Sequence, residues 1–245
     1  MKKYLTVFAV FAFLGIVAVI FMLGSRSLTP GEASERMAAS GNIQIQTGDM
    51  IELPQPVTDG DMSIEKALTL RRSVRSYSSE PLNLAEVSQL LWSAQGITNE
   101  QGFRTAPSAG ATFPLEMFMV VNNVDGLKKG IYHYQPHGHQ LEFIRDEDVS
   151  SALFRACLSQ SMITDGGAVL VFAADFERTT ERYGERGIRY VHNEIGHAGQ
   201  NVHLQAAAMD LGTVVIGAYR DDEVEGILQL RENLNVLYLM PVGRI

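Results

Sequence analysis

The sequence predicts an α+β fold, a mixed, mainly antiparallel sheet flanked by helices, preceded by one N-terminal transmembrane helix. Apolar, strand-like runs lie close together in the first half of the domain and are separated by helical patterns in the second half, as expected of helices and strands packed in layers. Over residues 190–211 apolar side chains recur at spacings of four and three, which predicts one long amphipathic helix. Residues 4–23 are almost wholly apolar.

The N-terminal apolar segment is long enough to cross a bilayer. As a helix at about 1.5 Å per residue it would span the roughly 30 Å hydrocarbon core. It is longer than the apolar part of a usual signal peptide, and residues 24–27 are a poor match to a small-x-small cleavage site. Lys2 and Lys3 precede it, which favours a cytoplasmic N-terminus and an extracytoplasmic domain. We therefore expect a signal-anchor over 1–24, a linker over 25–61 and one domain over 62–245.

Composition limits the classes of function. The formal net charge of −8 disfavours a nucleic-acid partner, because an acidic protein repels the phosphate backbone. Cys157 is the single cysteine and lies in an amphipathic helical pattern, which predicts a buried, inert thiol. The histidines of the long helix, His192, His197 and His203, do not share one face at ligand spacing. We expect local polar roles for them and no metal site.

Local signals place most elements of the domain. Ser63 is expected to cap a helix that runs to Arg71, and Asn83 with Glu86 has the spacing of a capping box that begins a helix ending at Gly96. Strands are predicted over residues 116–121, 130–134, 140–144, 168–173, 213–218 and 236–242.

The segment from Arg71 to Arg75 places three guanidinium groups and the Ser73 hydroxyl within five residues. Guanidinium groups make bidentate, charge-assisted hydrogen bonds to phosphate, and a serine hydroxyl adds a further short donor. The segment therefore favours an anion site, with a phosphorylated ligand as the natural occupant. The alternative is a solvated basic end of a helix, where arginine also complements the helix dipole.

Two segments of small residues would let a flat ligand approach the backbone. Residues 104–111 contain Pro107, Ser108 and Gly110, which suits close approach but also an ordinary loop. Residues 211–218 could instead be a helix C-cap at Gly212 followed by a buried strand. The chain has no G-x-S-x-G, Walker A or G-x-G-x-x-G sequence, so a serine hydrolase, a nucleotide hydrolase and a Rossmann site lack their signatures.

Taken together, these segments resemble the nitroreductase-like flavoprotein family, and within it the SagB-type branch that includes azoline dehydrogenases. The resemblance runs from about Ser63 to the C-terminus. It is carried, in register, by RRSVRSY (71–77), SQLLWSAQGIT (88–98), RTAPSAGATFPLE (104–116), GIYHY (130–134), the run over 177–218 and LYLMPVGR (237–244).

The resemblance implies an α+β flavin-reductase fold, a homodimer, and FMN bound at the subunit interface, with NADH or NADPH as electron donor. The arginine segment would hold the phosphate and ribityl end of FMN, and the loop after residue 106 would reach the flavin from the partner subunit. The implied cofactor-binding residues are Arg71, Arg72, Ser73, Arg75 and Arg244 toward the phosphate, Pro107, Ser108 and Ala109 from the partner, Gly212 and Thr213 near the reactive flavin edge, and Gln200 and Asn201 toward the ring or ribityl chain.

One departure from the family pattern affects the chemistry. Azoline-oxidising members have a catalytic Lys-Tyr pair in the region that corresponds to Arg182 and Tyr183, so this chain has arginine in place of that lysine. Arginine, with a pKa above about 12, is a poor general base at neutral pH. Tyr183 keeps the capacity to donate or relay a proton, whereas Arg182 is suited to stabilising an anion or positioning a substrate.

The sequence therefore predicts a membrane-anchored FMN oxidoreductase that transfers hydride between flavin and a small organic substrate, with NAD(P)H as donor and a quinone or nitro compound as acceptor. The first alternative is a SagB-like dehydrogenase of azoline or peptide-derived substrates. The second is a non-catalytic flavin- or peptide-binding module of a membrane assembly.

Overall fold

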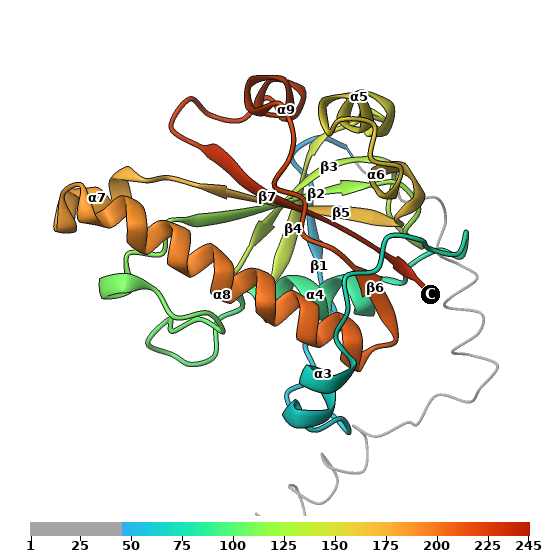
Figure 1. The fold of residues 1–245 in the computed structure, drawn as a ribbon, viewed down its shortest axis with the longest axis horizontal. Coiled ribbons are helices and arrows are strands. Elements are labelled where there is room, and N and C mark those ends of the chain that lie inside the picture. The colour runs from blue at the N-terminus through green and yellow to red at the C-terminus, as the bar shows by residue number, and fades with distance from the viewer. Residues whose placement is uncertain (1–45) are drawn as a thin grey trace, which may run out of the picture. The chain divides into compact units, whose positions relative to one another are not determined.

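A seven-stranded sheet organises residues 46–245, the part of the chain that the computed structural model describes (Figure 1). Its order is β1-β4-β3-β2-β5-β7-β6, and all pairings between these strands are antiparallel. The sequence predicted a mixed, mainly antiparallel sheet. In the described structure the strands pair only antiparallel, and parallel pairing is confined to isolated bridges, as between Ser73 and Thr213. The strands are β1 (Met50–Glu52), β2 (Leu115–Val121), β3 (Gly130–Gln135), β4 (Gln140–Arg145), β5 (Ala168–Ala174), β6 (Leu211–Thr213) and β7 (Asn235–Arg244).

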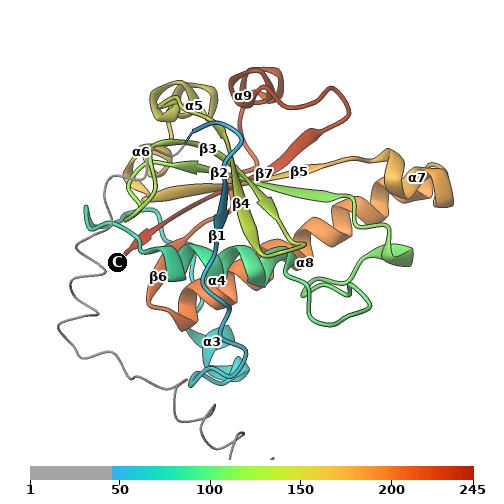
Figure 2. The same ribbon diagram turned by 180° about the vertical axis from the view of Figure 1, so that it is seen from behind.

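Helices cover both faces of the sheet. Figures 1 and 2 show α4 and α8 on one face and α5, α6 and α9 on the other. The helices are α3 (Ile64–Leu70), α4 (Leu84–Gln95), α5 (Ser150–Ala156), α6 (Met162–Asp165), α7 (Glu177–Tyr183), α8 (Arg186–Ala208) and α9 (Asp221–Leu228), with a 3₁₀ turn at Ala109–Ala111.

The central strands are apolar on both faces, which is why their sequences do not alternate. In β2, Met117 and Met119 belong to the hydrophobic core beneath α4 and α8. Phe118 and Val120, between them, belong to the core beneath α5, α6 and α9. Successive side chains of a strand point to opposite faces, so a strand covered on both sides needs an unbroken apolar run.

The locally encoded helices match their predictions. Ser63 caps α3, and its hydroxyl accepts from the Lys66 amide. At α4 the capping box is confirmed: the Asn83 side chain accepts from the Glu86 amide at 2.9 Å, and the Glu86 carboxylate accepts from the Asn83 amide at 2.8 Å. Gly96 ends the helix as predicted. The long helix α8 begins earlier than expected, at residue 186, and ends at residue 208.

The prediction for residues 211–218 was only partly right. The strand covers Leu211–Thr213 alone, and Gly212 lies within it rather than capping α8. The turn after the helix falls on Asp210, which has a φ of 54°. A Cβ at Gly212 would lie 2.8 Å from the Val74 side chain and 2.6 Å from the Ile245 side chain, so the glycine is needed for the close approach of these two residues to β6.

The predicted linker over 25–61 contains one strand that was not expected. Residues 50–52 pair with β4 as an edge strand. Within residues 46–245 no helix is both long and apolar enough to cross a membrane, and the anchor predicted over 1–24 lies outside the described residues. Cys157 is fully buried, as predicted, and burial raises the pKa of its thiol to about 12, which disfavours the reactive thiolate.

Candidate functional site

The predicted anion segment leaves α3 and runs beside β6. Arg71 caps the end of α3, and the Val74 amide donates to the Thr213 carbonyl at 2.9 Å. Within the described part of the chain, neither Arg71 nor Arg75 forms an ion pair. Arg72 instead folds back onto the helix end, donating to the Thr69 carbonyl at 3.0 Å. Unneutralised arginines that share a short segment favour an anionic ligand.

His203 lies behind this segment, on the C-terminal half of α8. It is 8% exposed, and its Nδ1 has no hydrogen-bond partner among the described residues. Burial, and secondarily the charge of Arg71, lower the pKa of its imidazole. A buried imidazole with an unpartnered Nδ1 therefore lies near Arg71. Sequence reasoning had rejected His203 as a metal ligand and missed this position, which is visible only once α3 packs on α8.

The other residues expected near the arginine segment are held by the protein itself. Arg244 forms an ion pair with Glu86 at 2.8 Å and is 31% exposed. Thr213 is 2% exposed, and its hydroxyl donates to the Pro241 carbonyl at 2.9 Å. Gly212 and Thr213 are therefore brought beside the arginine segment, but both are buried. In residues 211–218 the exposed small residues are Gly217 and Ala218.

The loop that contains Pro107, Ser108 and Ala109 lies near the N-terminal end of α8. Its backbone is unusual, since Gly110, Ala111 and Phe113 all have positive φ. The Phe113 amide donates to the Ser108 hydroxyl at 2.9 Å, and Arg178 donates to the Phe113 carbonyl at 3.1 Å. Pro107 is exposed, whereas Ser108 and Ala109 are half-buried. The loop is thus fixed in a conformation that an unsupported chain would rarely adopt.

The predicted catalytic pair packs against the same loop. Arg182 Nη1 donates to the Gly110 carbonyl at 3.0 Å, and a Cβ at Gly110 would lie 2.5 Å from the Tyr183 hydroxyl oxygen. The Tyr183 ring meets the Tyr190 ring edge-on with centroids 5.1 Å apart. Arg182 therefore supports the loop through its guanidinium, a contact that the fork geometry of arginine suits.

A buried polar cluster that the sequence reasoning missed lies under this loop. Glu194 on α8 is 2% exposed, and its Oε1 has no partner among the described residues. Burial raises the pKa of this carboxyl to about 7, against smaller opposing effects of the Ser108 hydroxyl and the Arg104 charge. Arg104 donates to Gln95 at 2.7 Å. The sequence did contain a sign of this cluster, because Glu194 lies on the apolar stripe of the long helix, between Val191 and Ala198.

Glu194→Gln should stabilise the protein at and above pH 7 by about 1 to 3 kcal/mol relative to wild type. The raised pKa means that the unfolded chain ionises first as pH rises above 4.5, so wild-type stability falls until about pH 7. The advantage of the variant should therefore grow between pH 5 and 7, as measured by urea denaturation. Glu181→Gln, on the exposed surface of α7, is the control. An equal pH dependence in both variants would contradict the assignment.

The arginine segment and the catalytic pair occupy opposite ends of α8. Figures 1 and 2 show α7 at one end of this helix and α3 at the other. Tyr190, which contacts Tyr183, lies about 20 Å along the helix axis from His203 at 1.5 Å per residue. Between them Gln200 is exposed, and Asn201 donates to the Thr105 carbonyl at 3.2 Å. One chain therefore does not bring all the predicted residues together.

Comparison with known proteins agrees with this arrangement of motifs. Residues 68–244 match the profile of the nitroreductase family. This chain belongs to the nitroreductase family. The match makes it an oxidoreductase of that family and confirms the resemblance seen in the sequence.

Three proteins illustrate the range of those to which this nitroreductase-family chain is similar. "Putative nitroreductase MJ1384" from Methanocaldococcus jannaschii is 48% identical over 197 residues, which are 80% of this chain and 98% of that protein. The microcin B17-processing protein McbC of Escherichia coli is 30% identical over 133 residues, 52% of this chain and 48% of McbC. A nitroreductase-type crystal structure from Ralstonia eutropha has a TM-score of 0.69 and 28% identity, covering 82% of this chain and 91% of that one.

Proposed function

We propose that this nitroreductase-family protein is an FMN-dependent oxidoreductase that uses NADH or NADPH to reduce a small organic acceptor of the nitro or quinone type. The observation that carries the proposal is the segment from Arg71 to Arg75, whose arginines at both ends have no carboxylate partner in the described part of the chain. Three like charges within five residues repel one another, and a bound anion would relieve that repulsion.

The residues present fit the phosphate end of FMN. Arg71 and Arg75 supply guanidinium donors and Ser73 supplies an exposed hydroxyl, while His203 lies buried near Arg71 with one ring nitrogen unpartnered. Arg244 would join them through the part of its guanidinium that Glu86 leaves exposed. FMN, when bound, supplies a ring that accepts and donates hydride. The chain's part is to bind the phosphate, orient the ring and exclude water.

The separation of the two half-sites favours a homodimer. On α8 the exposed residues Arg189, Asn193, Gly196 and Gln200 form one stripe, with Gly196 near the middle of the helix. Two copies of α8 that cross there in opposite directions would bring the Tyr183 end of one chain toward the Arg71 end of the other. Partner packing would also cover the apolar residues that α3 exposes, which are Ile64 (57% exposed), Leu68 (53%) and Leu70 (43%).

The position of Arg182 supports one substrate class over the other. The SagB-type resemblance, together with similarity to the microcin B17-processing protein McbC, favours as a second candidate the oxidation of azoline or peptide-derived substrates. That chemistry needs a base, and Arg182 donates to the Gly110 carbonyl rather than offering a basic nitrogen. Tyr183 can still give a proton to a reduced acceptor, so the nitro- or quinone-type reaction is the better supported one.

The cellular location is part of the proposal. We infer that residues 1–24 anchor the chain in a membrane with the nitroreductase domain outside the cytoplasm, because lysines precede an apolar segment of spanning length. Reporter fusions at the C-terminus test this: activity of an alkaline phosphatase fusion supports it, and activity of a cytoplasm-dependent fluorescent fusion alone contradicts it.

The visible absorbance spectrum of the purified protein tests the proposed chemistry. We expect a flavin spectrum, FMN by mass, and bleaching on anaerobic addition of NADH or NADPH, followed by reoxidation with a quinone. Flavin that stays oxidised with both nicotinamides would contradict the reductase and favour the dehydrogenase. Absence of flavin after reconstitution with FMN would favour the non-catalytic binding module.

A further inference from the structure

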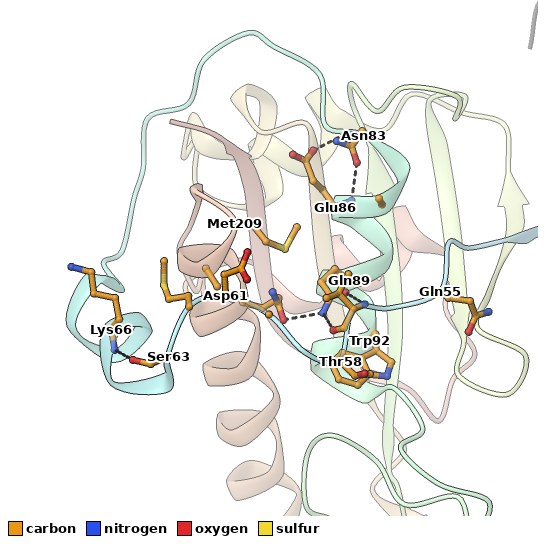
Figure 3. Close-up of a pocket in the computed structure, with 16 residues that line it drawn as sticks. Gln55, Thr58, Asp61, Ser63, Lys66, Asn83, Glu86, Gln89, Trp92 and Met209 are labelled. Atoms are coloured by element: carbon orange, nitrogen blue, oxygen red, sulfur yellow. Dashed lines mark hydrogen bonds between the residues drawn. The ribbon is translucent and has the colours of Figure 1, made fainter. Parts of the chain in front are cut away.

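A cavity of about 800 Å³ lies beneath the segment that leads from β1 into α3 (Figure 3). We refer to residues 53–62 as the lead-in strap. The strap forms one wall, and α4 and the C-terminal end of α8 form the others. None of the residues implied in flavin binding lines this cavity. Its volume falls within the range of pockets that bind drug-sized ligands.

Hydrogen bonds to its backbone fix the lead-in strap in place. The Ser88 hydroxyl donates to the Pro54 carbonyl at 2.6 Å. Gln89 makes two bonds to Val57, accepting from its amide at 2.8 Å and donating to its carbonyl at 3.0 Å. These bonds join the strap to α4 independently of the strap's own side chains. The cavity is therefore preformed, which lowers the entropic cost of binding.

The apolar part of the lining suits a flat ring. Trp92 on α4 presents a half-buried indole, and the thioethers of Met62 and Met209 lie on the wall with it. Aromatic rings and polarisable sulfur atoms contact planar aromatic groups favourably. Figure 3 shows Trp92 and Met209 on different elements around the same space.

The polar part of the lining suits an uncharged group. Gln89 donates to the Gln205 side-chain oxygen at 3.1 Å, which orients the Gln205 amide. The amide nitrogen of Gln205 makes no hydrogen bond among the described residues and is free to donate to a carbonyl. Lining charges largely balance, since Asp61 and Lys66 are of opposite sign and Glu86 is paired with Arg244 at 2.8 Å. Asp61 and Lys66 are both exposed, so a charged ligand would lose its hydration and gain only a weak, solvent-screened partner at the rim.

We propose that this cavity is a second ligand site, separate from the flavin contacts, for an uncharged planar aromatic molecule that carries an amide or carbonyl group. Trp92, Met62 and Met209 hold the ring, and the Gln205 amide bonds the carbonyl oxygen. The site does not depend on the redox activity of the protein.

Trp92 gives a direct readout of binding, because it is the single tryptophan of the chain. The full-length protein is titrated with benzamide while its tryptophan emission is recorded. We expect saturable binding of benzamide. Benzoate, which has the same ring and a negative charge, should bind at least tenfold more weakly. Cyclohexanecarboxamide, which has the amide without the flat ring, should also bind at least tenfold more weakly. Excess FMN should leave the benzamide affinity unchanged within about twofold.

Matched variants locate the binding. Gly60 lines the cavity and Gly226 lies on α9, and an added Cβ has no atom within 4 Å at either position. Gly60→Phe should abolish benzamide binding, Gly226→Phe should not change it, and Gln205→Leu should weaken it about tenfold. No saturable response to benzamide, equal binding of benzoate, or an unaffected Gly60→Phe variant would each overturn the proposal. Displacement of benzamide by FMN would overturn the separation of the two sites.

Discussion

Replacing Arg71 or Arg75 with alanine is expected to weaken FMN binding by about tenfold to a hundredfold each, and replacing both by more. A charge-assisted hydrogen bond to phosphate contributes about 1 to 3 kcal/mol, and 1.4 kcal/mol corresponds to a factor of ten in affinity. The whole loss of FMN affinity should be measurable, because neither arginine side chain forms an ion pair in the described residues. Removal of a guanidinium therefore breaks no other ion pair.

Two controls separate a phosphate contact from damage to the fold. Riboflavin has the same ring and ribityl chain and lacks the phosphate, so its affinity should fall much less than that of FMN in either variant. Arg155→Ala removes an exposed arginine from α5, on the opposite face of the sheet, and should leave FMN binding intact. Affinities are measured by flavin fluorescence at two salt concentrations, since higher salt screens the phosphate contacts. An equal loss of riboflavin and FMN would contradict the assignment.

The sequence predicted best those parts of the fold that neighbouring residues determine. The limits of α4 follow from Asn83, Glu86 and Gly96, which act within one turn of the helix ends, and all three have the predicted roles. The limits of the strand predicted over 213–218 and observed at Leu211–Thr213 could not be predicted in this way. Its length depends on pairing with β7, which is distant in sequence, and the reason for Gly212 is the approach of Val74 and Ile245.

In the candidate site, too, the sequence predicted features that depend on residue type and missed those that depend on tertiary packing. The residue types from Arg71 to Arg75 indicate an anion from the sequence alone, because guanidinium chemistry does not depend on the fold. The pairing of Arg244 with Glu86 and the burial of Thr213 depend on tertiary packing and had no local signal. Glu194 is intermediate, since a carboxyl on an apolar helical stripe is visible in the sequence, whereas its elevated pKa requires the burial that the fold imposes.

Placing tryptophan at Gly196 is expected to convert the protein into a monomer and to remove most of its flavin. In the described structure a Cβ at Gly196 meets no atom within 4 Å, so the indole has room within its own chain. Helix propensity also rises when glycine is replaced, so the folded chain should keep its stability. In the proposed dimer the same indole would stand where two copies of α8 cross, and the interface would have to separate to admit it.

The control is Gly226→Trp, since Gly226 is also an exposed glycine with no atom near an added Cβ, and lies on α9 across the sheet from α8. Light scattering gives the oligomeric state, absorbance gives the flavin content, and urea denaturation checks the fold of each variant. We expect a stable, flavin-poor monomer for Gly196→Trp and wild-type behaviour for Gly226→Trp. A Gly196→Trp monomer with full flavin content would show that one chain suffices for the cofactor, and that Pro107, Ser108 and Tyr183 of a second chain are not needed. A dimer with full flavin would show that α8 does not cross its copy at Gly196, and the two half-sites would then have to meet through another face.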